Sequence, residues 1–191
     1  MRQASPNEKT VIKGKRVVLR PPVNADAAEF LAVNRRSAKF NRGLASPPTT
    51  ARQFAAFLKR NTQAGGGASF MICRADDGAV MGSIGLSQIF HGGFRSAYVG
   101  YQIGEEFSRQ GYMTEALQLI LRHAFGKLKL HRLEANIQPG NVASIALVKR
   151  AGFVKEGYSR RYLKICGRWR DHERWAILVE HWRKQRQALS R

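Results

Sequence analysis

The sequence predicts a single mixed α/β domain. At 191 residues, 43% of them apolar, the chain is long enough for one well-buried core and short for two. Strand-like and helix-like segments follow in the order strand, two helices, three strands, helix, strand, helix and two strands. The third of the central strands leads through a glycine-containing turn into an amphipathic helix, an arrangement that suits phosphate groups. We expect the domain to span residues 14–182, with a disordered basic leader at 1–13 and a frayed basic tail at 183–191.

The first elements are a short strand and two helices. The strand, at residues 15–20, has β-branched character and ends before Pro21 and Pro22. Asn24 is placed to cap the first helix, and Thr50 with Gln53 forms a capping-box pattern before the second. Between the helices, the basic segment 41–49 contains two prolines and is predicted to be irregular. Such a segment suits one wall of a substrate cleft.

The middle of the chain predicts a hairpin, a further strand and a long helix. Residues 69–74 and 80–86 flank the turn sequence Asp-Asp-Gly at 76–78, a strong hairpin signal. Residues 96–103 are strand-like and run into the glycine-containing turn. The apolar positions of residues 113–127 form one stripe, as expected for a helix with one buried face.

The last third predicts one more helix between strands. The expected elements are a strand at 131–137, a helix at 142–151 that Asn141 caps and Gly152 ends, and two strands at 153–165 and 171–179 joined by a turn at Cys166–Gly167. These elements would complete one central sheet.

The chain is strongly basic, with 33 Lys and Arg against 13 Asp and Glu and a formal net charge of +20. Such a charge attracts polyanions such as nucleic acid, ribosomes or phosphorylated cofactors. A solvated basic surface on an ordinary enzyme explains the same excess, so charge alone identifies no partner.

The two cysteines, Cys73 and Cys166, are far apart and lack metal-ligand spacing. We therefore expect no disulfide framework and no metal ion. The N-terminus is polar and basic, and no run approaches the ~20 apolar residues of a membrane span. The sequence thus predicts a cytoplasmic protein with no membrane partner, as a monomer or homodimer.

Five motifs follow one another in the second half of the chain. They are Tyr101-Gln-Ile-Gly-Glu-Glu106, Arg109-Gln-Gly-Tyr-Met-Thr-Glu-Ala116, Asn141-Val-Ala-Ser-Ile-Ala-Leu147, Ala151-Gly-Phe-Val-Lys-Glu-Gly-Tyr158 and Trp169-Arg-Asp-His172. Taken together and in order, they resemble the GCN5-related N-acetyltransferases and, within them, the RimJ/RimL-type enzymes that acetylate protein N-termini. The resemblance covers roughly residues 14–182, and it implies the GNAT fold and acetyl-CoA as the acetyl donor.

The resemblance also implies the residues that bind acetyl-CoA. The turn before the long helix would wrap the pyrophosphate with backbone N–H groups, and the preceding strand would align the pantetheine arm. The cofactor-binding residues implied are Gln102, Ile103, Arg109, Gln110, Gly111, Met113, Thr114 and Asn141. The plain alternatives are an ordinary strand-to-helix turn, a core strand and a simple helix cap. Ser108 and Met113 depart from the usual family pattern, which backbone contacts tolerate.

The catalytic residues implied are Ser144, as the partner of the CoA sulfur, and Glu156, as a base. Asn136 and Lys149 stand where many family members have a Glu base and a Tyr acid. The alternatives are a hydroxyl bonded to its own backbone for Ser144 and simple surface charge for Glu156. An α-amine with pKa near ~8 is about a tenth neutral at pH 7, so an N-terminal transferase needs little from a base.

We therefore expect an acetyl-CoA-dependent transferase acting on a protein N-terminal α-amine, with a ribosomal protein as the acceptor and the basic surface near RNA. One alternative is an acetyltransferase for a small amine such as a polyamine or aminoglycoside, although such cations favour an acidic cleft. The other is a non-catalytic relative that binds RNA and CoA, which the two replaced catalytic positions favour.

Overall fold

The computed structural model describes residues 10–62 and 67–189, which form one mixed α/β domain. The eight strands of its sheet are β1 (Ile12–Lys13), β2 (Val17–Arg20), β3 (Ala68–Arg74), β4 (Val80–Ser87), β5 (Ser96–Ile103), β6 (Arg132–Ile137), β7 (Val154–Ile165) and β8 (Arg168–Leu178). The α-helices of the described residues are α1 (Ala27–Arg36), α2 (Ala51–Thr62), α3 (Tyr112–Arg122), α4 (Val142–Arg150) and α5 (Val179–Leu189). The predicted fold class is confirmed.

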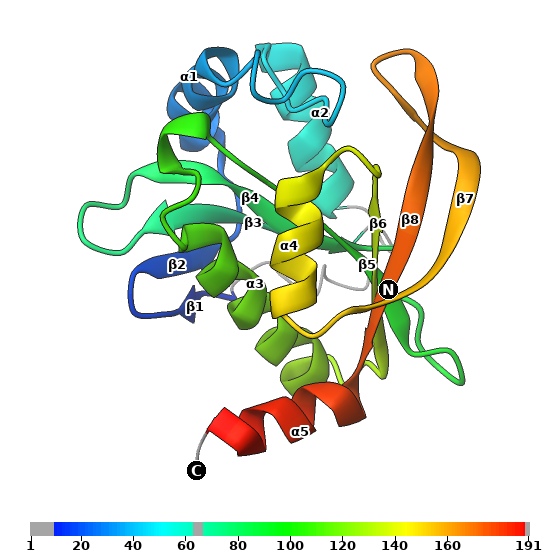
Figure 1. The fold of residues 1–191 in the computed structure, drawn as a ribbon. Coiled ribbons are helices and arrows are strands. Elements are labelled where there is room, and N and C mark those ends of the chain that lie inside the picture. The colour runs from blue at the N-terminus through cyan, green and yellow to red at the C-terminus, as the bar shows by residue number, and fades with distance from the viewer. Residues whose placement is uncertain (1–9, 63–66, 190–191) are drawn as a thin grey trace.

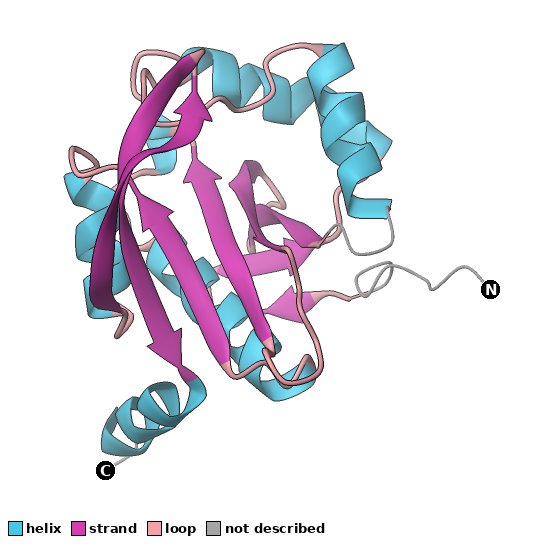
Figure 2. Cartoon of the chain, turned by 90° about the vertical axis from the view of Figure 1, so that its right-hand side faces the viewer, coloured by secondary structure: helices cyan, strands magenta, loops and turns pink. Residues whose placement is uncertain are grey.

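The strands lie in the order β1-β2-β3-β4-β5-β6-β8-β7 and pair antiparallel except at β5–β6, which is parallel. In Figure 1, α3 and α4 lie in front of the sheet, and α1 and α2 lie together at the top. Figure 2 shows the twist of the sheet from the side and the long β7–β8 hairpin. The parallel pair needs a crossover, which α3 supplies.

Two apolar clusters hold the helices to the sheet. The larger lies under α3 and α4 and includes Leu117, Ile120 and Val148, none of them exposed. The smaller joins α1 and α2 to β3 and β4 around Phe30 and Phe54. The two clusters lie on opposite faces of the sheet because neighbouring strand residues alternate between them.

The predicted capping box of α2 is confirmed. The backbone N of Gln53 donates to Thr50 Oγ1 at 3.3 Å, and the backbone N of Thr50 donates to Gln53 Oε1 at 3.1 Å. The predicted cap at Asn24 is wrong, because Asn24 opens a 3₁₀ turn (Asn24–Asp26) before α1. The buried carboxylate of Asp26 instead accepts from the backbone N of Val23 at 2.8 Å.

Both chain ends differ from the prediction. Ile12 and Lys13, expected in a disordered leader, form β1 against β2. Residues 183–189, expected to be frayed, belong to α5. Trp182 in the first half of α5 is buried against Phe125, with ring centroids 5.4 Å apart, and this contact holds the helix. Residues 1–9 of the predicted leader and 190–191 of the predicted tail lie outside the described residues.

Two further boundaries moved. The helix predicted at 113–127 becomes α3 followed by a π-helical turn at His123–Lys127. The last strand begins at Arg168 and not at 171, so β7 and β8 form a long hairpin around the turn at Cys166–Gly167. No helix among the described residues is long and apolar enough to cross a bilayer.

Candidate functional site

The turn before α3 has the geometry of an anion site. Arg109 and Gly111 have left-handed backbone angles, with φ of 59° and 85°, and no side chain of the described residues caps the first turn of α3. A Cβ on Gly111 would lie 3.8 Å from Arg16 Nη1, which is an ordinary contact. The position therefore favours glycine because of its positive φ and not because of a lack of space. The uncapped N–H groups and the positive end of the helix dipole suit a phosphate.

Contacts with Arg16 and Val17, at the start of β2, hold this turn in place. Arg16 Nη1 donates to the carbonyl of Gln110 at 3.0 Å, and its guanidinium lies 4.2 Å from the ring centroid of Tyr112. Glu115 Oε1 accepts from the backbone N of Arg16 at 2.8 Å and of Val17 at 3.2 Å. Of the other residues that the family resemblance assigned here, Met113 and Thr114 lie half-buried in the same first turn.

The sheet opens next to this turn. β5 and β6 pair over only three residues each, starting at Ser96 and Arg132. Beyond these pairs, residues 99–103 are paired with β4 alone and residues 135–137 with β8 alone. We call these two segments the strand divergence. It leaves one edge of β5 with main-chain donors and acceptors that pair with no described strand.

Gln102 and Ile103 lie at the end of this free edge. Both are half-buried, and both pair with β4 on their other side, at Ser83 and Gly82. The side chain of Gln102 is directed to Ser83, with 3.4 Å between Nε2 and Oγ. An extended ligand arm is able to pair with this edge as an added strand would.

The start of α4 lies beside the divergence. Asn141 is the N-cap, as predicted, and its Oδ1 accepts from the backbone N of Ser144 at 3.1 Å. The cap leaves the Ser144 hydroxyl free to act elsewhere, because the bond uses only its backbone. Ser144 is half-buried in the first turn.

Two buried polar atoms of the divergence have no hydrogen-bond partner among the described residues. They are the hydroxyl of Tyr101 on β5 and Oδ1 of Asn136 on β6. Tyr101 packs on the core beneath α3 and α4, whereas Asn136 alternates with the core residues Ala135 and Ile137 and so faces the other side of the sheet. Unpaired buried polar groups are rare in folded proteins, and each calls for an explanation such as a ligand. Tyr101 opens the first of the five family motifs, but the sequence assigned it no role of its own.

Glu156 is engaged in an ion pair. Its carboxylate accepts two hydrogen bonds from Arg132, from Nη1 at 3.0 Å and from Nη2. Arg132 also donates from Nε to Glu134 at 2.8 Å. The hydrogen bonds from Arg132 lower the pKa of Glu156. A carboxylate held in this way is a weak base, so the geometry does not favour the predicted role of Glu156.

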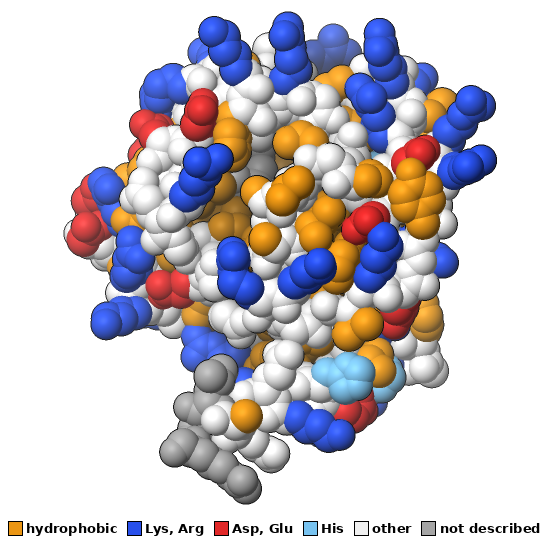
Figure 3. All heavy atoms as spheres, viewed as in Figure 1, with side chains coloured by type: hydrophobic (Ala, Val, Ile, Leu, Met, Phe, Trp, Pro, Cys, Tyr) orange, Lys and Arg blue, Asp and Glu red, His pale blue; other side chains and the backbone are white. Residues whose placement is uncertain are grey.

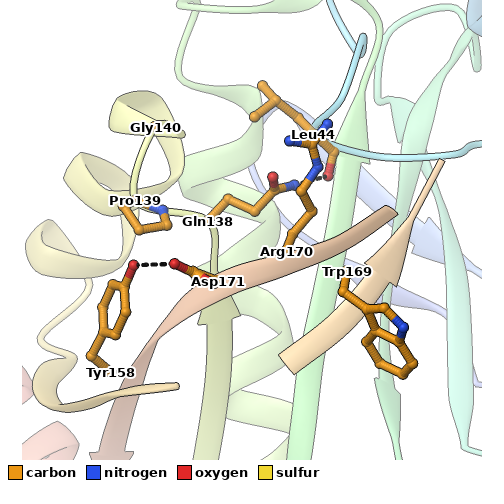
Figure 4. A pocket seen from close by; sticks show the side chains of 8 residues that line it. All are labelled: Leu44, Gln138, Pro139, Gly140, Tyr158, Trp169, Arg170 and Asp171. Carbon is orange, nitrogen blue, oxygen red and sulfur yellow. Dashed lines mark hydrogen bonds between the residues drawn. The ribbon is translucent and has the colours of Figure 1, made fainter. Parts of the chain in front are cut away.

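A pocket of about 360 Å³ lies beside the carboxyl end of β6. Figure 4 shows its lining, which comes from the α1–α2 segment, the β6–α4 turn and the β7–β8 hairpin: Leu44, Gln138, Pro139, Gly140, Tyr158, Trp169, Arg170 and Asp171. The segment 41–49 therefore lines a pocket, as predicted for a cleft wall.

Hydrogen bonds join the walls of this pocket. Gln138 Nε2 donates to the carbonyls of Gly43 at 2.8 Å and Leu44 at 3.2 Å, which ties the β6–α4 turn to the α1–α2 segment. Tyr158 donates its hydroxyl hydrogen to Asp171 Oδ2 at 2.7 Å. Arg170 lines the pocket, and its buried Nε has no partner among the described residues.

Lys and Arg side chains are spread widely over the molecule. Figure 3 shows them along the top edge, over α1 and α2, with Asp and Glu interspersed lower down. The exposed cations of that region include Arg35, Lys39, Arg42, Arg52 and Arg60. Within the described residues, no three His, Cys, Asp or Glu side chains come together as a metal site.

The chain belongs to the GNAT family of acetyltransferases. The family model for the acetyltransferase (GNAT) domain matches residues 16–154, well over half of the chain. This span contains the turn before α3, the strand divergence and the start of α4.

Two curated relatives match over more than half of the chain. "Probable N-acetyltransferase YjcK" of Bacillus subtilis (strain 168) is 42% identical over 109 residues, 57% of this chain. The "[Ribosomal protein uS5]-alanine N-acetyltransferase" of Escherichia coli (strain K12) is 38% identical over 107 residues, 56% of this chain. The match spans 60% and 55% of these two relatives.

Among solved structures, Mycobacterium smegmatis RimJ in complex with CoA-disulfide is similar over nearly the whole chain. The TM-score is 0.81 with 27% identity, and the match covers 91% of this chain and 89% of that one. The predicted RimJ-type resemblance is therefore confirmed.

Proposed function

We propose that this protein transfers the acetyl group of acetyl-CoA to the N-terminal α-amine of a protein, and that its acceptor is a ribosomal protein. The observation that carries the proposal is the strand divergence, which lies between an uncapped helix start on one side and the pocket at the end of β6 on the other. A donor and an acceptor that approach from opposite sides of a sheet meet where it opens.

The residues present fit acetyl-CoA. The turn at 109–111 and the first turn of α3 supply N–H donors for its phosphates, and the free edge of β5 supplies pairing groups for its amide-containing arm. Asn141 and Ser144 lie where that arm would end. The coenzyme supplies an acetyl group on a thioester, which is reactive toward a neutral amine.

The chain's own residues then have three tasks: to hold the amine, to exclude water and to deliver a proton to the departing sulfur. The Ser144 hydroxyl is the candidate donor for the sulfur, because it lies in the first turn of α4 beside the divergence, with its backbone fixed by Asn141. Little base is required, since about a tenth of an α-amine with pKa near ~8 is neutral at pH 7.

The pocket favours a peptide over a polycation. Asp171 is the one acidic residue among the described residues that line it, and its carboxylate already accepts from Tyr158 and from the backbone N of Arg161. Arg170 adds a positive charge beside it. A polyamine would find no net negative charge here.

The relatives' names support the choice of acceptor, because one of them is named for the alanine of ribosomal protein uS5. The net charge of +20 suits work near rRNA. It would repel a basic acceptor tail, so the charge favours proximity to RNA and not a direct grip on the tail.

The test measures thiol release from acetyl-CoA with matched acceptors. We expect turnover with a peptide that carries a free α-amine and little with the same peptide blocked at its N-terminus but containing lysine. Faster turnover of spermidine or of the blocked peptide would overturn the N-terminal assignment. Binding of CoA in calorimetry without turnover of any amine would favour the non-catalytic alternative. Mass spectrometry of ribosomal proteins after incubation then tests the ribosomal acceptor, and no new acetyl group on any of them would overturn it.

A further inference from the structure

Tyr101 is a half-buried tyrosine with a buried hydroxyl, in the middle of the strand divergence. Its ring packs on the core beneath α3 and α4, and its hydroxyl is out of contact with solvent. No described residue completes a hydrogen bond with this hydroxyl. A phenylalanine would fill the same space without leaving a polar atom unpaired, so core packing alone does not explain a tyrosine here.

Ser144 is the side chain whose hydroxyl affects the pKa of Tyr101. Burial raises the pKa of Tyr101 to about 12, and the neighbouring Ser144 hydroxyl acts in the opposite direction. Tyr101 therefore stays protonated at working pH and always has a hydrogen to donate. The two hydroxyls do not yet meet hydrogen-bond geometry, and such contacts commonly tighten only when the substrates are bound.

We propose that Tyr101 is a positioning residue for the acetyl transfer, donating its hydroxyl hydrogen to Ser144 Oγ and so directing the Ser144 hydrogen toward the CoA sulfur. This inference rests on the proposed function. The reason is that each hydroxyl has one hydrogen to donate and can also accept. If Ser144 Oγ accepts the Tyr101 hydrogen, the Ser144 hydrogen is available for a second acceptor.

The proton balance of the step is closed. The amine nitrogen bonds to the acetyl carbon, the carbon–sulfur bond breaks, and sulfur keeps the electron pair. Ser144 gives its hydroxyl proton to the sulfur, and its oxygen regains a proton from the nitrogen, which loses one on becoming an amide. Tyr101 keeps its proton throughout, which suits a buried phenol because ionising it there is unfavourable.

The test is Tyr101→Phe, with Tyr98→Phe as the matched control. Tyr98 lies three residues earlier on β5, on the other face of the sheet and away from Ser144. We expect kcat of Tyr101→Phe to fall about ten- to a hundredfold, with the KM for acetyl-CoA and the affinity for CoA within about twofold of the wild type. The melting temperature should not fall, because the removed hydroxyl has no partner in the fold. Tyr98→Phe should keep its kcat.

A double variant tests whether Tyr101 acts through Ser144. If it does, Tyr101→Phe should cost little in a Ser144→Ala background, since both changes remove the same proton delivery. Independent, multiplying losses would overturn the pairing, and so would a kcat for Tyr101→Phe within about twofold of the wild type. A lower melting temperature with a proportionate loss of CoA binding would make Tyr101 merely structural.

The wild type is assayed in the same series. Lack of wild-type turnover with every amine would overturn the proposed function and, with it, the role of Tyr101. Normal wild-type turnover together with an unaffected Tyr101→Phe overturns the role of Tyr101 alone.

Discussion

Replacing Glu156 by Gln separates a catalytic base from an ion-pair partner. Glu156 is 43% exposed and shares Arg132, 21% exposed, with Glu134. Because the ion pair between Glu156 and Arg132 is partly exposed, solvent screens it. We therefore expect Glu156→Gln to lower the free energy of unfolding by about 1 kcal/mol or less. For a chain of this length, that is a melting temperature lower by about 2–4 °C.

The effect on catalysis is the informative part. A positioned general base is worth about 10²–10⁴-fold in rate. Because Arg132 lowers the pKa of Glu156 and occupies both its oxygens, we expect kcat of Glu156→Gln to stay within about threefold of the wild type. Initial rates at saturating acetyl-CoA and α-amine peptide measure this.

Glu134→Gln is the matched control, because Glu134 binds the same arginine from β6. A hundredfold loss of kcat in Glu156→Gln, with Glu134→Gln unaffected, would refute this reasoning and restore Glu156 as the base. The pH dependence has a definite sign. The pKa of Glu156 is lower in the folded protein than its ordinary value of 4.5, so its stabilising contribution is present above about pH 4.5 and is lost as the pH falls below it. Acid unfolding of Glu156→Gln should therefore begin from a lower stability but fall less steeply.

Three further substitutions test the fold and the anion site. Gly111→Ala puts an alanine into the left-handed backbone region without a steric clash. It should lower the free energy of unfolding by about 1 kcal/mol and weaken CoA binding in calorimetry. An unchanged affinity for CoA would contradict the anion-site geometry. In the wild type, Arg20 donates to the buried Asp26 carboxylate at 2.6 and 2.9 Å. Asp26→Asn removes the charge partner of Arg20 and should lower the free energy of unfolding, measured in urea, by about 3 kcal/mol. Thr50→Ala removes one half of the capping box and should cost about 1 kcal/mol in the same assay; no loss would mean that Gln53 alone secures the start of α2.

Elements with strong local signals were predictable from the sequence. β5 occupies Ser96–Ile103 as expected, and the capping box of α2 and the cap at Asn141 are present. For the capping box and the cap at Asn141, the deciding interaction lies within a few residues along the chain. The turn before α3 was found for the same reason, because the helix start and its glycine are neighbours in sequence.

Features set by tertiary contacts were missed. β1 has only two residues and exists because β2 pairs with it. The polar sequence of α5 resembles a solvated tail, and the contact of Trp182 with Phe125 holds it in place. The start of α1 depends on the ion pair between Asp26 and Arg20, six residues apart on different elements, which overrode the local cap signal at Asn24.

The same distinction applies to the site. The family motifs predicted roles for the turn before α3 and for Ser144, but not the opening of the sheet, because strand pairing joins residues far apart in sequence. The sequence named Tyr101 only as a motif residue and Asn136 only as the replacement of a Glu base. That the Tyr101 hydroxyl and Asn136 Oδ1 lack a hydrogen-bond partner among the described residues is seen only in three dimensions. The ion pair between Arg132 and Glu156 likewise joins strands β6 and β7, and it changed the expectation for Glu156.

The short seam between β5 and β6 has a mechanical consequence. Among the described strands, three residue pairs, beginning at Ser96 and Arg132, are the only strand pairing between β1–β5 and the group β6, β8 and β7. A small rotation about this seam would change the width of the strand divergence without breaking a strand pair in either group. Ala97 and Leu133, paired with each other in the seam and buried in the core, would limit such a rotation.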